Sequence, residues 1–187
     1  MRKVTYSMGV TLDGFIKGPD GGFAWGDPAP EVFALSMEEI QEVGVHLLGR
    51  RLHETMLYWE TADPATFDPM ERAWAALWNP LPKVVFSRTL TEVDGQAARL
   101  ATGTLAEEIE RLRAEPGEGD IAIGGADLAA PAAEADLIDE YLIRVFPVLV
   151  GGGTPFFARD GQQRRLELVE TRTFPSGVVY LRHRRVR

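Results

Sequence analysis

The sequence predicts an α/β fold of three layers, α/β/α, with a mostly parallel central sheet, an antiparallel edge and a C-terminal hairpin. Two observations lead to this fold class. Short runs of β-branched and apolar residues alternate with segments of helical composition along most of the chain. The last two runs, 166–174 and 178–184, flank a Pro-Ser-Gly turn, as in a hairpin. We expect one domain over residues 1–187, a length that allows a substantial core.

The first half of the chain begins with a predicted strand over residues 4–10, which are rich in β-formers. A helix is predicted from Pro30, where an acidic first turn suits a helix N-terminus. The apolar run 45–48 predicts a short buried strand. Asp68 then opens another helix as its N-cap, and Glu71 completes a capping box.

The second half continues the alternation. Its predicted elements are strand 83–86, a short strand at 99–100, a helix from 105, strand 121–123, helix 126–135 and strand 141–150. Thr104 and Glu107 form a second capping box ahead of the helix from 105.

Composition and charge exclude several classes of function. The formal net charge of −8 argues against a nucleic-acid-binding surface, which needs a basic face. The chain has no cysteine, so disulfides and thiolate chemistry are excluded, and its three histidines lack metal-ligand spacing. No apolar run reaches the ~18 residues of a membrane span, and no signal-peptide pattern opens the chain. We therefore expect a cytoplasmic protein without a metal site.

A pair of glycines gives the strongest indication of function. Gly124 and Gly125 separate a β-branched run from a helical segment that opens with Ala126, Asp127 and Leu128. A helix that begins directly after a glycine turn presents free backbone N–H groups, to which a phosphate can bind. The same pattern is also common in turns that serve only close packing. Both interpretations are open at this point.

Two other strand ends carry related chemistry. Gly49, Arg50 and Arg51 follow one predicted strand, and Ser87-Arg88-Thr89 follows another. The carboxyl ends of parallel strands share one edge of a sheet, where ligands bind. Guanidinium groups, hydroxyls and the backbone amides of Gly125 and Ala126 would suit two separated phosphates, as in a dinucleotide. The common G-x-G-x-x-G fingerprint and the P-loop are both absent from the sequence.

A glycine-rich segment near the N-terminus offers candidate acids. Asp13 precedes Gly14 and Phe15, and a dense cluster of turn residues, 18–22, follows. Such a loop is either a functional lid or a surface excursion. An aspartate in a partly apolar pocket could have a raised pKa and donate a proton, or Asp13 could simply hold the turn. The candidate substrate-binding residues are Gly14, Phe15, Trp25, Asp27 and Glu31.

Five motifs in order resemble a known family. They are Asp13-Gly14-Phe15-Ile16, Leu48-Gly49-Arg50-Arg51, Phe86-Ser87-Arg88-Thr89-Leu90, Ile123-Gly124-Gly125 and Pro147-Val148-Leu149-Val150-Gly151-Gly152-Gly153. Together they look like the dihydrofolate-reductase-like superfamily. More closely, they resemble the C-terminal reductase domain of the bacterial riboflavin-biosynthesis deaminase–reductase and its stand-alone relatives, over nearly the whole chain.

The resemblance implies a sheet that binds NADPH. The residues that would hold the adenosine 2′-phosphate and ribose are Gly49, Arg50, Arg51, Leu52, Ser87, Arg88 and Thr89. The pyrophosphate would lie on Gly124, Gly125, Ala126, Asp127 and Leu128. The nicotinamide and substrate would be lined by Gly9 and by the loop with Asp13, Gly14, Phe15, Ile16 and Lys17.

Three features of the sequence depart from the family pattern. Many relatives have threonine at the position of Leu52, whose hydroxyl binds cofactor phosphate, so here only the backbone amide remains. Riboflavin-pathway reductases usually carry an acidic residue ahead of the glycine turn, where this chain has Ile123. The H-x-E and P-C-x-x-C pattern of a zinc deaminase requires cysteines that this chain lacks.

We therefore expect an NADPH-dependent reductase of a small pyrimidine- or pterin-like ring or its ribosyl derivative. It would resemble 5-amino-6-(5-phosphoribosylamino)uracil reductase of riboflavin biosynthesis and pass hydride to a carbonyl or imine carbon, with Asp13 as the catalytic polar contact. The alternative is a non-catalytic dinucleotide-binding domain that senses or sequesters its ligand. We also expect a homodimer through the terminal hairpin, since an exposed edge strand invites pairing.

Overall fold

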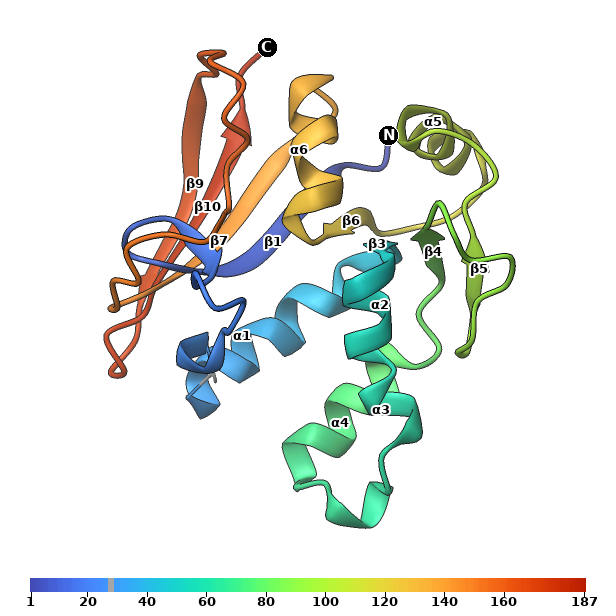
Figure 1. Ribbon diagram of the computed structural model, residues 1–187, viewed down its shortest axis with the longest axis horizontal. Coiled ribbons are helices and arrows are strands. Elements are labelled where there is room, and N and C mark those ends of the chain that lie inside the picture. Colours follow the sequence, from blue (N-terminus) through green and yellow to red (C-terminus); the bar gives the residue numbers. More distant parts are fainter. Residues whose placement is uncertain (27–28) are drawn as a thin grey trace.

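The centre of the fold is an eight-stranded sheet in the order β5-β4-β3-β6-β1-β7-β10-β9 (Figure 1). The computed structural model describes residues 1–26 and 29–187. The strands of this sheet are β1 (Val4–Thr11), β3 (Val43–Gly49), β4 (Lys83–Phe86), β5 (Ala98–Leu100), β6 (Asp120–Gly124), β7 (Glu140–Phe146), β9 (Leu166–Thr173) and β10 (Val179–Arg185). All pairings from β5 across to β7 are parallel, and β10 pairs antiparallel with both β7 and β9.

Helices cover both faces of the sheet, so the predicted three-layer α/β/α class is confirmed (Figure 1). The helices are α1 (Pro30–Gln41), α2 (Arg50–Met56), α3 (Tyr58–Thr61), α4 (Pro69–Trp78), α5 (Leu105–Ala114) and α6 (Ala126–Glu134), with short 3₁₀ turns η1 (Ala24–Gly26) and η2 (Pro64–Thr66). α5 and α6 lie on one face, and α1 to α4 lie on the other. Both predicted capping boxes are present, at the starts of α4 and α5.

The core divides at the sheet into two sides. On the α5–α6 side, residues such as Val4, Ile121 and Ile123 form one large buried cluster with the alanines of α6. On the opposite side, Leu48 and Trp78 lead a cluster between the sheet, α1 and α4. The apolar runs that predicted the strands are therefore buried because helices cover both of their faces.

The predicted strand 141–150 ends earlier, at Phe146, and this part of the prediction was wrong. Pro147 follows, and a proline has no N–H for the sheet ladder. The chain turns there, with the Val148 amide donating to the Phe146 carbonyl at 2.8 Å. The Leu12 amide donates to the Val148 carbonyl at 2.9 Å, which ties this segment to the end of β1.

A small second sheet, which the sequence analysis did not predict, joins two loops. β2 (Phe15–Lys17) pairs antiparallel with β8 (Thr154–Pro155). It brings the loop after β1 against the loop after β7, although the two are more than 130 positions apart in the sequence. In residues 1–26 and 29–187, no helix has both the length and the apolar character needed to cross a bilayer.

Candidate functional site

The carboxyl ends of β4, β3 and β6 lie side by side, as the sequence predicted. Gly49 at the end of β3 is in register with Phe86 at the end of β4. On the other side, Leu48 of β3 is in register with Gly124 at the end of β6. The motifs that follow these three strands are therefore brought to one edge of the sheet, which we call the strand-end edge.

The glycine pair lies at the N-terminus of α6. Gly125 is the N-cap residue with φ of +90°, a conformation that favours glycine. No side chain of the described residues caps this helix, so the backbone N–H groups of its first turn are available to a ligand. Asp127 lies in that first turn and is exposed, whereas Ala126 and Leu128 are buried.

Leu52 lies directly against the glycine pair. A Cβ atom placed on Gly124 would be 2.7 Å from Leu52 Cδ2 and 2.8 Å from His46 Cε1. At Gly125 the nearest atom to such a Cβ is again Leu52 Cδ2, at 3.8 Å. Leu52 therefore makes an apolar contact with the glycine turn. A threonine at this position would offer a polar hydroxyl instead.

The predicted turn at Gly49-Arg50-Arg51-Leu52 is the first turn of α2, with Gly49 as its N-cap. Arg50 donates to Glu54 Oε1 at 2.7 Å and to Thr89 Oγ1 at 3.0 Å. It therefore links α2 to the turn after β4. The Arg51 guanidinium is exposed and makes no hydrogen bond or ion pair with the rest of the described chain.

The turn after β4 is held by its own serine. Ser87 Oγ accepts hydrogen bonds from the amides of Thr89, at 3.2 Å, and Leu90, at 3.1 Å. The Arg88 side chain is exposed, and its guanidinium has no partner among residues 1–26 and 29–187. Among the described residues, the positive charges of Arg51 and Arg88 at the strand-end edge are therefore not neutralised, whereas Arg50 is paired with Glu54.

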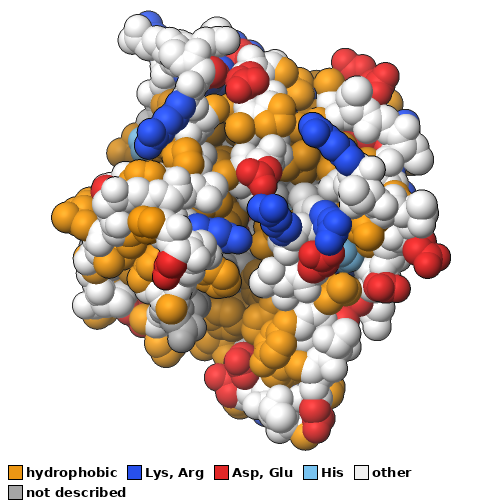
Figure 2. All heavy atoms as spheres, in the orientation of Figure 1, with side chains coloured by type: hydrophobic (Ala, Val, Ile, Leu, Met, Phe, Trp, Pro, Cys, Tyr) orange, Lys and Arg blue, Asp and Glu red, His pale blue; other side chains and the backbone are white. Residues whose placement is uncertain are grey.

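One face of the molecule combines basic side chains with a hollow (Figure 2). Figure 2 shows Lys and Arg side chains gathered near the middle of one face, above a hollow whose floor is apolar. This face is the one on which α2 and α6 begin in Figure 1. An acidic protein therefore presents a local basic rim beside an apolar floor, an arrangement suited to a ligand with an anionic part and a flat apolar part.

Asp13 holds two backbone amides rather than lying in an apolar pocket. Its carboxylate accepts from Gly151 N at 2.7 Å and from Val150 N at 3.2 Å. The side chain is exposed. A hydrogen bond from the Thr11 side chain, with the amides of Gly151 and Val150, lowers the pKa of Asp13 below its usual value. The raised pKa expected for a proton donor is not found, and the geometry favours the turn-holding role.

The rest of the N-terminal candidate loop packs against the triple-glycine loop. The Gly14 carbonyl accepts from Phe156 N at 2.9 Å. Gly153 has φ of +123°, and a Cβ there would be 2.0 Å from the Lys17 carbonyl oxygen. Ile16 is buried, and Lys17 Nζ lies 5.8 Å from the centre of the Phe23 ring. The 13–18 segment and the 147–153 loop therefore form one unit.

The remaining substrate-side candidates are dispersed. The Phe15 ring lies under the Arg159 guanidinium, and Trp25 packs edge-on against Phe146 at 5.5 Å. Gly9 lies on the same side, because a Cβ on it would be 3.0 Å from the Phe146 ring. Glu31 accepts from the Ser176 amide at 3.3 Å, in the β9–β10 hairpin turn, and is not brought to the strand-end edge. Asp27 lies outside the described residues.

Two neighbours of the site were missed by the sequence analysis. His46 lies beneath Gly124, and burial, with the charge of Lys83 nearby, lowers the pKa of His46 to about 4. The amides of Val150 and Gly151 are bound by Asp13, a contact that no local spacing signals. Within the described part of the chain, no group of three or more His, Cys, Asp and Glu side chains is arranged to hold a metal ion.

Comparison with known proteins gives two relatives from Bacillus subtilis (strain 168) and several structures of the same fold. The chain is 35% identical to the uncharacterized protein YyaP of Bacillus subtilis (strain 168) over 182 residues, 96% of this chain and 93% of that protein. A Shewanella sp. PV-4 protein provisionally assigned to riboflavin biosynthesis has a TM-score of 0.78 at 23% identity, with 99% of each chain covered.

Two further structures extend the likeness in fold. The deaminase/5-amino-6-(5-phosphoribosylamino)uracil reductase of Thermotoga maritima has a TM-score of 0.68 at 14% identity, over 99% of this chain and 57% of that one. Dihydrofolate reductase of Enterococcus faecalis, complexed with NADP(H), has a TM-score of 0.62 at 17% identity, over 99% and 97% of the chains. Residues 2–180 match the RibD C-terminal domain family. With its dihydrofolate-reductase-like fold and the strand-end edge described above, the chain belongs to the RibD C-terminal domain family.

Proposed function

We propose that this chain is an NADPH-dependent reductase of a small pyrimidine- or pterin-like ring, or of its ribosyl derivative. One observation carries the proposal. The strand-end edge combines a helix N-terminus at Gly125 that no described side chain caps with two guanidinium groups, from Arg51 and Arg88, that have no partner among residues 1–26 and 29–187. Backbone N–H groups and arginine forks are the donors that dinucleotide phosphates require. The relatives support the choice of cofactor, since one of them is a dihydrofolate reductase in complex with NADP(H).

Each part of the edge has a distinct task in this proposal. The first turn of α6 would hold the pyrophosphate through backbone N–H groups. Arg51 and Arg88 would bind the adenosine 2′-phosphate, while Arg50 positions α2 against the turn at Thr89. The bound cofactor supplies hydride, and the apolar floor beside the basic rim excludes water from the ring that accepts it. Asp13 positions the 13–18 segment by holding the Val150 and Gly151 amides, and delivery of a proton is not assigned to it.

Titration with NADPH and with NADH, followed by tryptophan fluorescence, tests the cofactor site. A charge-assisted hydrogen bond contributes about 1.5–3 kcal/mol, so Arg88→Ala and Arg51→Ala should each weaken NADPH binding roughly 10- to 100-fold. The affinity of both variants for NADH, which lacks the 2′-phosphate, should fall much less. Arg165→Ala is the matched control, because this exposed arginine precedes β9 at the opposite edge of the sheet. Equal losses for both cofactors, or no binding of either, would refute the assignment.

Turnover separates the reductase from a non-catalytic dinucleotide-binding domain. Oxidation of NADPH in the presence of ribosylaminopyrimidines and pterins should follow saturation kinetics. Binding of NADPH without turnover of any of these substrates would instead support a domain that senses or sequesters the dinucleotide.

We further propose that two copies associate through β9. This strand is at the outer edge of the sheet, and no strand of the described residues pairs with its outer side. Leu168 is 52% exposed and Val169 is 41% exposed, so apolar side chains project from the same strand. Light scattering at a protein concentration of ~100 μM should give the mass of a dimer, because this concentration exceeds dissociation constants in the micromolar range. Leu168→Lys should give a monomer. The control Tyr58→Lys, at an exposed position on α3, should remain a dimer. A monomeric wild type would refute this proposal.

A further inference from the structure

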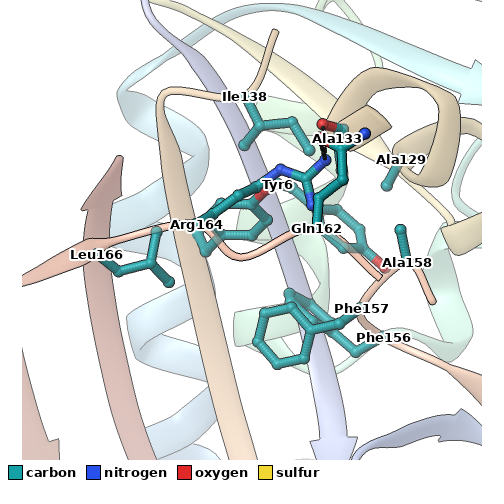
Figure 3. Close-up of a pocket in the computed structure, with 11 residues that line it drawn as sticks. Tyr6, Ala129, Ala133, Ile138, Phe156, Phe157, Ala158, Gln162, Arg164 and Leu166 are labelled. Carbon is teal, nitrogen blue, oxygen red and sulfur yellow. Dashed lines mark hydrogen bonds between the residues drawn. The ribbon is translucent and has the colours of Figure 1, made fainter. Parts of the chain in front are cut away.

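A cavity that the strand-end edge does not use lies on the α6 face of the sheet. It has a volume of about 230 Å³. Tyr6 of β1, Tyr141 near the start of β7, and the C-terminal half of α6 with Ala133 line it. Figure 3 shows Ala129 and Ala133 of α6 on one side of this space and Phe156 and Phe157 on the other. The cavity begins one helical turn beyond the glycine turn, because Ala129, whose amide donates to the Gly125 carbonyl at 3.0 Å, forms part of its wall, whereas Gly124 and Gly125 do not line it.

Aromatic rings form most of the cavity wall. Tyr6 and Phe156 are stacked, with ring centres 4.3 Å apart and an angle of 16° between the planes. Phe157 meets Phe156 edge-on at 4.7 Å, and Tyr141 is 6.5 Å from Phe156. Phe157 is 49% exposed, so this wall is open to the outside. Flat walls of this kind favour a planar ligand that can stack on or meet the rings edge-on.

Two tyrosine hydroxyls in this wall have no hydrogen-bond partner among the residues that the structure describes. The Tyr6 hydroxyl is buried and finds no hydrogen-bond partner within the described residues. Tyr141 is 5% exposed, and no hydrogen bond of its hydroxyl is found in residues 1–26 and 29–187. Burial, with Asp127 as the next cause, raises the pKa of Tyr6, and burial also raises that of Tyr141. Both hydroxyls are thus neutral donors, and that of Tyr6 is a buried donor without an acceptor among the described residues, which is rare in proteins.

The charge in the cavity wall is cancelled within the protein. Arg164 donates to both carboxylate oxygens of Asp160, at 3.1 and 2.6 Å, and to the Ala133 carbonyl at 2.7 Å. Figure 3 shows Arg164 reaching across to Ala133. Since the guanidinium already has its counter-ion, the cavity offers no net charge to a ligand. A neutral molecule is therefore favoured over an anion.

The volume limits the ligand to a single ring. An apolar cavity of roughly 150 Å³ can hold benzene, whereas drug-sized ligands need about 300–1,000 Å³. The 230 Å³ found here lies between the two. This is too small for a dinucleotide and ample for one substituted ring.

We propose that this cavity is a second binding site, for a neutral, single-ring aromatic molecule that accepts a hydrogen bond from the Tyr141 hydroxyl. The site is distinct from the strand-end edge and does not depend on the proposed reductase activity.

Phenol is a suitable probe, with cyclohexanol as a control that keeps the hydroxyl and loses the planar ring. In protein labelled with ¹³C at alanine methyl groups, phenol should shift the Ala129 and Ala133 signals saturably and leave Ala75 of α4 unchanged. Cyclohexanol should bind more weakly, and saturating NADPH should not displace phenol. The absence of a saturable shift, or displacement by NADPH, would overturn the proposal.

Variants locate the binding. Tyr141→Phe removes one hydrogen bond and should weaken phenol binding about 2- to 10-fold. Tyr180→Phe is the matched control, because this buried tyrosine lies in a cluster on the other face of the sheet. Ala133→Leu should fill the cavity and abolish the shifts, with thermal unfolding confirming that the variant folds. If the methyl signals instead change with protein concentration and ignore phenol, a second copy fills the cavity and the proposal is wrong.

Discussion

Gly124 gives the sharpest test of how the strand-end edge is built. A Cβ at this position would be 2.7 Å from Leu52 Cδ2, 2.8 Å from His46 Cε1 and 2.9 Å from Leu48 Cδ2. Its backbone φ is not in the left-handed region, so Gly124→Ala introduces crowding without backbone strain. The substitution therefore measures packing alone.

The expected cost follows from these distances. Carbon atoms of side chains are in favourable contact at about 3.5–4.0 Å, so the three neighbours would have to withdraw by roughly 1 Å. Overpacking of a well-packed core by one methyl costs about 1–3 kcal/mol. Leu52 is partly buried and ends in a flexible side chain, so it should relax first. We expect Gly124→Ala to lower the free energy of unfolding by about 2 kcal/mol.

Urea denaturation, followed by the fluorescence of Trp78 and its neighbours, gives the free energies. Leu52→Ala removes the closest contact. In that background, Gly124→Ala should lower the free energy of unfolding by at least about 1 kcal/mol less than it does in the wild type. Residues in contact typically show couplings of roughly 0.5–3 kcal/mol. Gly152→Ala is the control, since the nearest atom to its Cβ is 3.8 Å away. Equal costs of Gly124→Ala with and without Leu52 would refute the packing argument.

Four further predictions follow. Asp13→Asn should speed hydrogen exchange of the Val150 amide but leave the pH profile of kcat/KM unchanged between about pH 5 and 9, because the lowered pKa keeps Asp13 ionised there; loss of one limb of that profile would contradict this. The folded-state pKa of His46, about 4, lies below its ordinary 6.5, so its contribution is complete above pH 6.5 and is lost as pH falls toward 4. The difference in unfolding free energy between wild type and His46→Gln should therefore shrink by up to about 3 kcal/mol from pH 7 to pH 4, and a constant difference would exclude a buried neutral imidazole. Asp127→Asn should tighten NADPH binding a few-fold, as seen by titration, because a carboxylate in the first turn of α6 repels phosphate; unchanged affinity would place the pyrophosphate elsewhere. The Lys83 ammonium is buried, 3.0–3.3 Å from four backbone carbonyl oxygens that share its three N–H groups and 3.6 Å from Glu60 Oε1. Lys83→Met would leave the Glu60 carboxylate without its cation and should cost about 3–5 kcal/mol in urea denaturation, whereas a cost below ~1 kcal/mol would show that these acceptors find other donors.

The sequence predicted the frame of the fold because local signals marked its elements. Asp68 and Thr104 open helices through capping boxes that the structure contains. The runs ahead of Gly49, Ser87 and Gly124 are apolar on both faces, which is the pattern of parallel strands covered by helices. Once those strands are parallel neighbours, their ends must share an edge, so the convergence of the motifs was predictable as well.

The parts that escaped prediction depend on contacts distant in the sequence. β2 and β8 are three and two residues long, and each is a strand only because the other pairs with it. The Asp13 carboxylate meets amides 137 and 138 positions away, which no spacing rule signals. The local sequence shows that Asp13 lies beside a glycine turn. That Asp13 is exposed and ionised follows only from its tertiary contacts with the Val150 and Gly151 amides.

The two interpretations that the sequence left open for the glycine pair apply to different glycines. Gly124 is required for packing, because Leu52, His46 and Leu48 surround the place of a side chain. A Cβ on Gly125 would make only ordinary contact with Leu52, at 3.8 Å, and this glycine is required for its φ of +90°, which lets α6 begin with free N–H groups facing the edge. A substitution at Gly124 should therefore act first on stability and be rescued by a smaller residue 52. Gly125→Ala should instead strain the turn by roughly 1–2 kcal/mol and weaken NADPH binding. Adding Leu52→Ala should not restore the stability lost in this variant. The glycine pair thus separates the part of this edge that stabilises the fold from the part proposed to bind the cofactor.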